Sequence, residues 1–437
     1  MIKRKKFPRI YFGWWAVVTG SFLNLWGAGY TVYGFGALFK PLSAELGFSR
    51  AVTSVASSIG RFGGGIEAPL TGWLTDRYGP KWIALFGVSL FGLGLILMKF
   101  VNSLWSFYLV WGVIVGTAAN LSSGIPINTA IANWFVKKRG IALGIRVMIS
   151  GVFALPIITW LIVNQGWRIA NVVGGLVMLL VGLPLVWFFI RQHRPEYYGL
   201  LPDGATVATG SPEDTKQMIE RGVEYAAEVE EIEFTLRQAI RTPAYWILIL
   251  FQSVSMTSMS SLMVHFMPLL TDIGMTPTKA AATMTIVGFF SVVARFGGGF
   301  VADRLRKTHL RFFMGGACLL QAGGITIFLL NQTVAVVYPF LIPYFIGGGI
   351  NMVLMSVIGG RYFGRKAFGS VRGSSAMFTM PLGMLLPVYF GWVFDTTDSY
   401  AIAFTAFAGL LVFTTALLIL TPPPRAPTQV TDIRKLV

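Results

Sequence analysis

The sequence predicts an all-α membrane protein with twelve transmembrane helices in two pseudo-symmetric six-helix bundles. The first reason is composition: 437 residues that are 54% hydrophobic and only 12% charged, with a mean hydropathy of +0.67. A soluble domain could not bury so much apolar surface. The second is a series of apolar stretches, most of them about 20 residues or longer, which suffices to cross a hydrocarbon core of roughly 30 Å. The third is an internal repeat that relates the two halves of the chain.

The apolar stretches define twelve candidate spans. Their approximate limits are residues 11–40, 50–75, 82–100, 104–134, 140–164, 168–191, 243–271, 278–302, 311–330, 333–360, 367–394 and 400–421. The basic start MIKRKKFPRI leads into the first span without a small-residue cleavage site, so we expect a retained helix rather than a signal peptide. The single cysteine, Cys318, lies in an apolar stretch and excludes a disulfide framework.

These spans divide the chain into four parts. Residues 1–191 are predicted to form an N-terminal six-helix bundle and residues 243–421 a C-terminal one. Residues 192–242 are predicted to form a cytoplasmic linker loop, which holds ten of the 18 acidic residues and is expected to be partly helical near Glu224–Arg241 and otherwise flexible. Residues 422–437 form a cytoplasmic tail.

The net charge of +17 is unevenly distributed. Basic residues cluster in alternate loops, for example Lys3 to Lys6, Lys137 to Arg139, and Arg304 to Arg311. The positive-inside rule then places both termini and the linker in the cytoplasm of a multi-pass protein of the cell inner membrane. This placement favours contact with anionic membrane lipids and argues against nucleic acid as a partner.

The internal repeat has a period of about 227 residues. The motif Gly-x-x-x-Asp-Arg occurs at Gly72–Arg77 and again at Gly299–Arg304, and Arg146 of span five corresponds to Arg372 of span eleven. Repeats of six spans predict a substrate site between the halves, near the middle of the membrane. Asp76, Arg77, Asp303 and Arg304 lie at helix ends in these motifs, where we expect them to gate the pathway through salt bridges and helix-end contacts.

Arg295 is the most informative single residue, because it lies inside the apolar stretch Ala280–Ala302. A guanidinium near the centre of a bilayer costs at least roughly 2.5–3.5 kcal/mol on the insertion scale. Arginine does not readily lose its proton, so it must face protein, water or an anion. The sequence therefore suggests that a negatively charged compound passes this residue; the alternative is an arginine that packs against other helices.

Several motifs resemble those of the major facilitator superfamily. The loop Gly72-Trp-Leu-Thr-Asp-Arg-Tyr-Gly-Pro-Lys81 matches its loop signature, and the second copy matches more loosely. Finer features are similar to the monocarboxylate porter branch, which includes bacterial oxalate–formate exchangers. These features are Tyr11–Trp15, Phe48–Ala51, Arg139–Gly144, Arg194–Gly204 and Phe234–Thr242.

The resemblance implies a role for Arg295, because in that branch an arginine of span eight binds the substrate carboxylate. Some lactate–proton members carry an acid one helical turn earlier, where this chain has Ser291, and a lysine in span one, where it has Tyr33. Proton symport therefore cannot simply be carried over, and both proton coupling and anion exchange stay open. A monomer is the default for the family.

Two further charged pairs follow from the expected fold. Glu67 lies nine residues before Asp76, roughly 13 Å from the cytoplasmic end of its helix. We predict a Glu67–Arg372 bridge, either a structural pair, or a conformational latch or proton site. Arg146 and Arg295 are expected at the pseudo-symmetric contact without an acid, where they would attract an anion. Snorkelling to the interface is the alternative for Arg146.

Other candidates for substrate binding are polar, aromatic or charged residues within spans. They are Arg61, Tyr33, Tyr30, Asn120, Asn351, Tyr344 and His265. In the resembled fold, spans one, four, seven and ten line the cavity. Hydrogen bonds between helices explain such residues equally well.

Together these features predict a secondary transporter of small organic anions, mono- or dicarboxylates, that works by alternating access. No cofactor, metal site or enzyme activity is expected, because the sequence has neither metal-ligand spacing nor a Ser/His/Asp set. One alternative is a non-transporting carboxylate sensor on a carrier fold. Another is an exporter of amphipathic compounds, although a cationic substrate would require more acids within the membrane.

Overall fold

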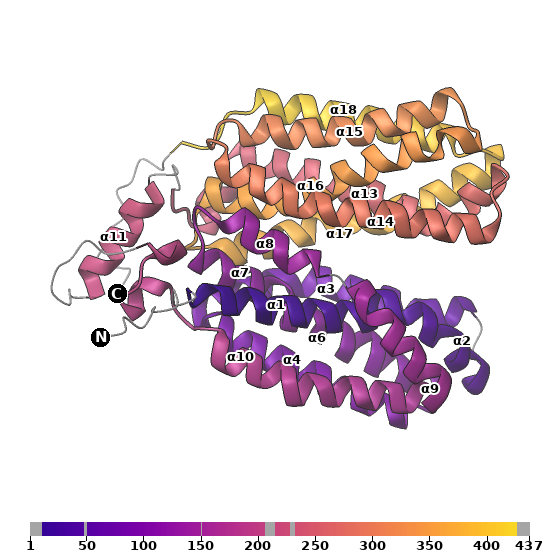
Figure 1. Cartoon of the computed structure of the whole chain (residues 1–437), viewed down its shortest axis with the longest axis horizontal. Helices are drawn as coiled ribbons and strands as arrows, with labels where there is room; N and C mark the ends of the chain where they lie inside the picture. The colour runs from indigo at the N-terminus through magenta and orange to yellow at the C-terminus, as the bar shows by residue number, and fades with distance from the viewer. Residues whose placement is uncertain (1–10, 48–49, 150, 206–214, 228–231, 426–437) are drawn as a thin grey trace, which may run out of the picture. The chain divides into compact units, whose positions relative to one another are not determined.

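The computed structural model describes residues 11–47, 50–149, 151–205, 215–227 and 232–425. All regular secondary structure in these ranges is helical. The chain forms two compact units, Met1–Tyr225 and Ala226–Val437, here called the N unit and the C unit. Figure 1 shows the first unit in indigo to magenta and the second in pink to yellow. The division falls inside the predicted linker, and the predicted four-part division remains a prediction.

In the N unit, span two is one long helix, whereas the other five expected spans are each divided into two or more helical pieces. Span one is α1 (Gly13–Ala28), the π-helical η1 (Gly29–Tyr33) and α2 (Gly34–Leu46); span two is α3 (Arg50–Tyr78); span three is α4 (Pro80–Leu97) with η2 (Met98–Phe100). Span four is α5 (Leu104–Phe107), η3 (Tyr108–Val115), α6 (Gly116–Ser123) and α7 (Ile125–Trp134). Span five is α8 (Arg139–Met148), η4 (Gly151–Ala154) and the start of α9 (Leu155–Val177). The rest of α9, η5 (Met178–Gly182) and α10 (Leu183–Phe189) make span six.

Three positions account for the main interruptions. Span four breaks at Gly124 (φ −81°, ψ −115°), where Pro126 follows and cannot donate a backbone hydrogen bond. Span five leaves its first helix at Ile149, whose ψ of 84° is not helical. Spans five and six meet at Gly166, whose φ of 80° is readily adopted only by glycine.

In the C unit, each expected span is one long helix. They are α13 (Pro243–Asp272), α14 (Pro277–Arg304), α15 (Leu310–Leu330), α16 (Val337–Phe363, preceded by η8, Val334–Val336), α17 (Phe368–Thr397) and α18 (Ala401–Leu420). Thr242 and Thr276 begin α13 and α14, where each side chain accepts a hydrogen bond from the third helical amide. A proline at the first helical position follows each cap, as the geometry of helix starts favours.

The described helices fill all twelve expected spans. Eight helical stretches among the described residues are long and apolar enough to cross a membrane. They cover spans three, four, five with six, seven to ten, and twelve. Spans one, two and eleven are the helices α1 with α2, α3, and α17.

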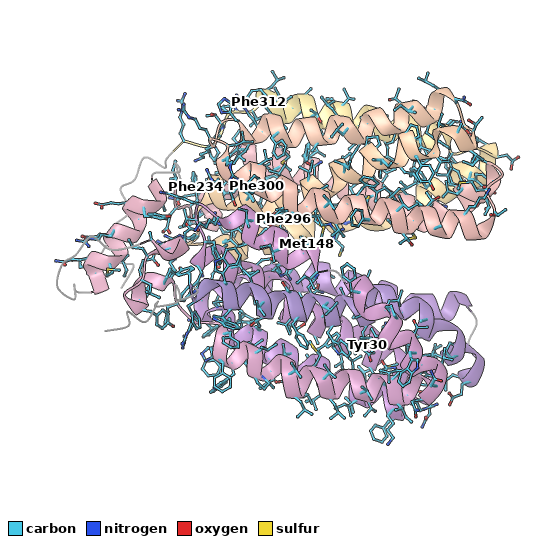
Figure 2. All side chains as sticks on the ribbon, in the orientation of Figure 1. Tyr30, Met148, Phe234, Phe296, Phe300 and Phe312 are labelled. Carbon is cyan, nitrogen blue, oxygen red and sulfur yellow. The ribbon has the colours of Figure 1, made fainter. Side chains whose placement is uncertain are left out.

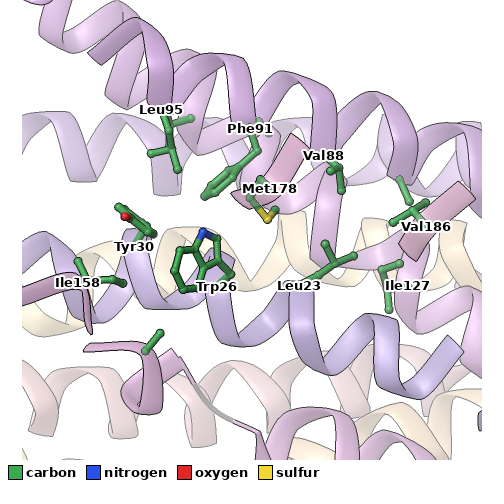
Figure 3. Close-up of a cluster of buried hydrophobic side chains, with 14 of the residues drawn as sticks. Leu23, Trp26, Tyr30, Val88, Phe91, Leu95, Ile127, Ile158, Met178 and Val186 are labelled. Atoms are coloured by element: carbon green, nitrogen blue, oxygen red, sulfur yellow. The ribbon is translucent and has the colours of Figure 1, made fainter. Parts of the chain in front are cut away.

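Side chains of span one, α4 and α9 form part of the core of the N unit. Figure 3 shows Trp26 and Tyr30 of span one close to Phe91 of α4, all at most 8% exposed. The indole of Trp26 donates to the carbonyl of Gly174 (3.0 Å), and the hydroxyl of Tyr30 donates to that of Ala170 (2.6 Å). Two polar groups inside this apolar cluster are thereby satisfied.

The described residues of the linker include four helical segments. They are η6 (Pro195–Tyr198), η7 (Pro202–Gly204), α11 (Thr215–Ala227) and α12 (Leu236–Ile240). The prediction that the linker is partly helical near Glu224–Arg241 agrees with the end of α11 and with α12, while residues 232–235 between them are not helical. The capping box formed by Thr235 and Gln238 instead begins a new helix there.

Candidate functional site

Arg295 lies in α14, nine residues before Arg304, which corresponds to about 13 Å along the helix. Its side chain is half-buried. One turn earlier, Ser291 is 2% exposed and lies against Gly349 of α16. A Cβ atom on Gly349 would come within 2.5 Å of the Ser291 carbonyl oxygen. The position where related transporters are expected to carry an acid is thus tightly packed around a hydroxyl. Figure 2 labels Phe296 and Phe300 on the same helix.

Arg146 is held inside the N unit, in the last turn of α8. It is 6% exposed, and Nη1 donates to Oδ1 of Asn128 at 2.9 Å. Nη2 donates to the carbonyl of Ser123, the last residue of α6. The break at Gly124 leaves this carbonyl at the end of a helix, so the guanidinium of Arg146 serves as its partner.

Glu67 and Asn120 lie together between α3 and α6. The side chains of Thr117 and Asn120 hydrogen bond to the carboxyl group of Glu67. Gly64 of α3 leaves room for the side chain of Asn120, because a Cβ atom at residue 64 would lie 2.2 Å from Nδ2 of Asn120. The predicted bridge from Glu67 to Arg372 would join the two units and stays a prediction. Within the C unit, Arg372 is half-buried in α17.

Tyr344 and Asn351 each belong to a small group of hydrogen-bonded side chains inside the C unit. The hydroxyls of Tyr344 and Ser258 are 2.6 Å apart. Nδ2 of Asn351 lies 3.4 Å from both Oγ of Ser255 and Oε1 of Gln321, and Ser255 donates to the same Oε1 at 2.8 Å. All five are at most 6% exposed. The sequence argument missed Gln321, although a lone glutamine in apolar span nine was a visible signal.

The remaining substrate candidates are dispersed. Tyr30 lies in the core of the N unit, as described above. Nδ1 of His265 lies 3.2 Å from the hydroxyl of Tyr400, and its ring packs on Phe390. The side chains of Tyr33 and Arg61 lie outside the described residues. Substrate contact by these residues stays a prediction.

The residues predicted to gate the pathway lie at helix ends in both units. The guanidinium of Arg77 lies over the ring of Trp73 (5.1 Å), one turn earlier. In the C unit, Arg304 lies over the ring of Phe300 (3.4 Å) and donates to its carbonyl. Asp76 and Asp303 are partly exposed at these ends, and their gating role stays a prediction.

Arg361 is a functional candidate that the sequence argument did not single out. It is 2% exposed near the end of α16, and it lies 3.4 Å from the backbone carbonyls of both Asp303 and Leu305. It therefore ties the second Gly-x-x-x-Asp-Arg motif to α16. The signal was its place just before the basic loop that follows span ten.

Comparisons with known proteins agree with this architecture. Residues 21–387 match the family described as Major Facilitator Superfamily. The chain is 24% identical to an oxalate:formate antiporter of Oxalobacter formigenes, over 91% of this chain and 88% of that protein. It is 27% identical to monocarboxylate transporter 4 of Gallus gallus, over 93% and 82%. Among solved structures, the proton:xylose symporter XylE has a TM-score of 0.67 at 11% identity, covering 93% of this chain and 94% of that one, which supports the fold alone.

Proposed function

We propose a substrate class for this chain, which belongs to the major facilitator superfamily. In this proposal it carries small mono- or dicarboxylates across the membrane by alternating access. Membership makes the chain a multi-pass secondary transporter and not an enzyme. The substrate class is the proposed part. It is supported by Arg295 and by the names of relatives, which state oxalate, formate and monocarboxylate.

The single observation that carries the proposal is the half-buried guanidinium of Arg295 inside α14, nine residues before the end of the helix. A carboxylate can accept two parallel hydrogen bonds from a guanidinium, which gives both strength and orientation. The helix provides no acid of its own before Asp303. A carboxylate is also the kind of anion that the names of the relatives state, so it is the substrate class that we propose for this position.

Arg146 is proposed to assist from the N unit as an oriented cation. Its partners Asn128 and Ser123 contribute neutral oxygens, so these two hydrogen bonds orient the guanidinium without cancelling its charge. Arg61, Tyr33 and Asn120 remain further proposed contacts.

The proposed topology places both termini in the cytoplasm and the protein in a cell inner membrane, as a monomer. The basic loops support this orientation. Because Ser291 stands where some lactate–proton transporters carry an acid, transport of the carboxylate can be coupled either to a proton or to exchange for a second anion. The two modes differ in what drives uptake. Symport responds to a pH gradient, whereas exchange requires a second carboxylate on the opposite side of the membrane.

The test is uptake of labelled lactate, pyruvate, oxalate and formate into proteoliposomes that contain the purified protein. Each acid is offered with and without a pH gradient, and with and without an internal carboxylate. We expect uptake of at least one acid, together with loss of that uptake in both Arg295→Gln and Arg295→Lys. Lysine keeps the charge but not the paired donors.

Arg306→Gln is the matched control, because Arg306 is an exposed arginine beyond the end of α14. Wild-type rates in both Arg295 variants would refute the proposed role. Binding of a carboxylate that raises thermal stability without flux would favour the sensor. Flux of amphipathic compounds alone would favour the exporter.

A further inference from the structure

The half-helix α8 is fastened at both of its ends. At the C-terminal end of α8, Nδ2 of Asn24 donates a hydrogen bond to the carbonyl of Ile149 (2.9 Å). In the last turn, Arg146 donates hydrogen bonds to Asn128 and Ser123, as described above. Because span five breaks after Met148, α8 is not continuous with α9 and depends on such contacts for its position. Figure 2 labels Met148 at this end.

A residue from the linker binds the loop that leads into the start of α8. Lys138, the residue before the helix, provides no side-chain cap. Instead, Oδ2 of Asp203 accepts hydrogen bonds from the amides of Val136 (3.1 Å) and Lys137 (2.8 Å), and Oδ1 accepts one from Lys138 (3.0 Å). A carboxylate is favoured there, because amides without partners and the helix dipole both attract negative charge.

The backbone around Asp203 is shaped to present this carboxylate. Asp203 has a φ of 60° and Gly204 a φ of 74°, two consecutive residues in the left-handed region. Aspartate is one of the few residues that tolerate this conformation. Asp203 is also 7% exposed, so a charged linker residue is buried against the membrane-spanning unit.

Neighbouring contacts hold the same linker segment, residues 194–204, which we call the clasp. The hydroxyl of Tyr11 lies 3.2 Å from the carbonyl of Leu201 in the clasp and 3.1 Å from that of Trp134 at the end of α7. Beyond the clasp, the ammonium group of Lys137 lies over the ring of Tyr225 in α11 (4.2 Å). The clasp and α11 thus both contact the loop that begins α8.

We propose that Asp203 is a positioning residue for transport, acting through α8 on Arg146. Loss of its carboxylate releases the amides of residues 136–138, α8 shifts, and the guanidinium of Arg146 leaves Ser123 and Asn128. The transport consequence rests on the proposed function, whereas the release of α8 does not.

The experiment compares Asp203→Ala and Asp203→Asn with the wild type by hydrogen–deuterium exchange and by carboxylate uptake. Asparagine keeps an acceptor oxygen and tolerates the left-handed backbone, so it should fold where alanine fails. Asp398→Asn is the control, because Asp398 is the other described non-glycine residue with positive φ (50°) and is exposed at the end of α17.

In Asp203→Ala we expect amide exchange at residues 136–138 to accelerate roughly 10- to 100-fold, the effect of losing hydrogen bonds to a charged group. Exchange across residues 139–149 should rise with it, and uptake should fall roughly 3- to 30-fold. Combining Asp203→Ala with Arg146→Lys should slow uptake no further than the slower single variant, because both act through one helix.

Faster exchange confined to residues 136–138, with unchanged uptake, would overturn the positioning role. Unchanged exchange at those residues would overturn the contact itself. If the protein carried none of the acids tested, the exchange experiment would still decide whether Asp203 positions α8, so the two proposals fail separately.

Discussion

The side chain of Asn24 donates a hydrogen bond to the backbone carbonyl of Ile149, joining span one to the point where span five leaves its first helix. A carbonyl released by a helix break inside a membrane needs such a partner, because no water is available in the hydrocarbon. Arg146 meets the same need for Ser123 at the break of span four. In the N unit, broken helices and buried polar side chains therefore occur together.

Replacing Asn24 by alanine should destabilise the N unit, because the carbonyl of Ile149 loses its donor. We expect the free energy of unfolding in detergent to fall by about 0.6–2 kcal/mol, the range of hydrogen bonds between membrane helices. Asn102→Ala, at an exposed site after η2, is the control and should have no effect. Equal losses in the two variants would contradict the capping role.

Introducing an acid one turn before Arg295 should weaken anion transport. In Ser291→Asp, the new carboxylate would share a helix face with Arg295 and compete with the substrate. We expect KM for the transported carboxylate to rise at least tenfold, which corresponds to about a third of the roughly 4 kcal/mol Coulomb attraction between two charges near a protein surface. Ser291→Asn has nearly the same shape without the charge and separates electrostatics from crowding beside Gly349. If both variants behaved alike, charge would not be the cause.

The contact of α16 with α14 should not tolerate a methyl group at Gly349. A Cβ atom there would meet the carbonyl of Ser291 at 2.5 Å, and backbone cannot easily move aside. Gly349→Ala should lower the free energy of unfolding by about 1–3 kcal/mol, as overpacking does. Gly359→Ala on the same helix meets nothing within 4 Å and should leave stability unchanged or slightly higher. Thermal unfolding of the two variants in one detergent makes the comparison.

The free energy of unfolding and KM together decide whether Tyr344 binds substrate or only packs within the C unit. Its hydroxyl bonds to Ser258 and its side chain is fully buried. We expect Tyr344→Phe to lower the free energy of unfolding by about 0.6–2 kcal/mol and to leave KM unchanged. Ser258→Ala should produce the same loss, and the double variant little more. A raised KM with intact stability would instead support the predicted contact with substrate.

The number and order of spans could be predicted because apolar length alone determines what can cross a bilayer. The breaks within spans four and five were not predicted, although Gly124-Ile-Pro126, Gly151 before α9 and Pro156 in its first turn are helix-breaking signals. A reading based on apolar length treats these residues as part of a continuous stretch. Membrane helices tolerate such breaks when a neighbour supplies partners, and the neighbours are known only from the fold.

The candidate site could be predicted only in part, for a related physical reason. In a helix that is apolar on every face, periodicity does not tell which polar residues face a pathway and which face another helix. Tyr344 and Asn351 were therefore grouped with Arg295. In the structure Tyr344 is hydrogen-bonded to Ser258, and Asn351 lies within hydrogen-bond distance of Ser255 and Gln321. The role of Asp203 was not visible either, because its three amide partners lie 65–67 residues earlier in the chain.

Asp203 lies in the linker but binds the loop before α8. This contact determines where the chain can be divided if the two halves are produced as separate polypeptides. A first fragment that stops where span six stops, near residue 191, would leave the amides of residues 136–138 bare. A fragment that continues through Tyr225 would contain Asp203, the hydrogen-bond acceptor for these three amides. Complementation by split genes should therefore succeed with the later cut and fail with the earlier one.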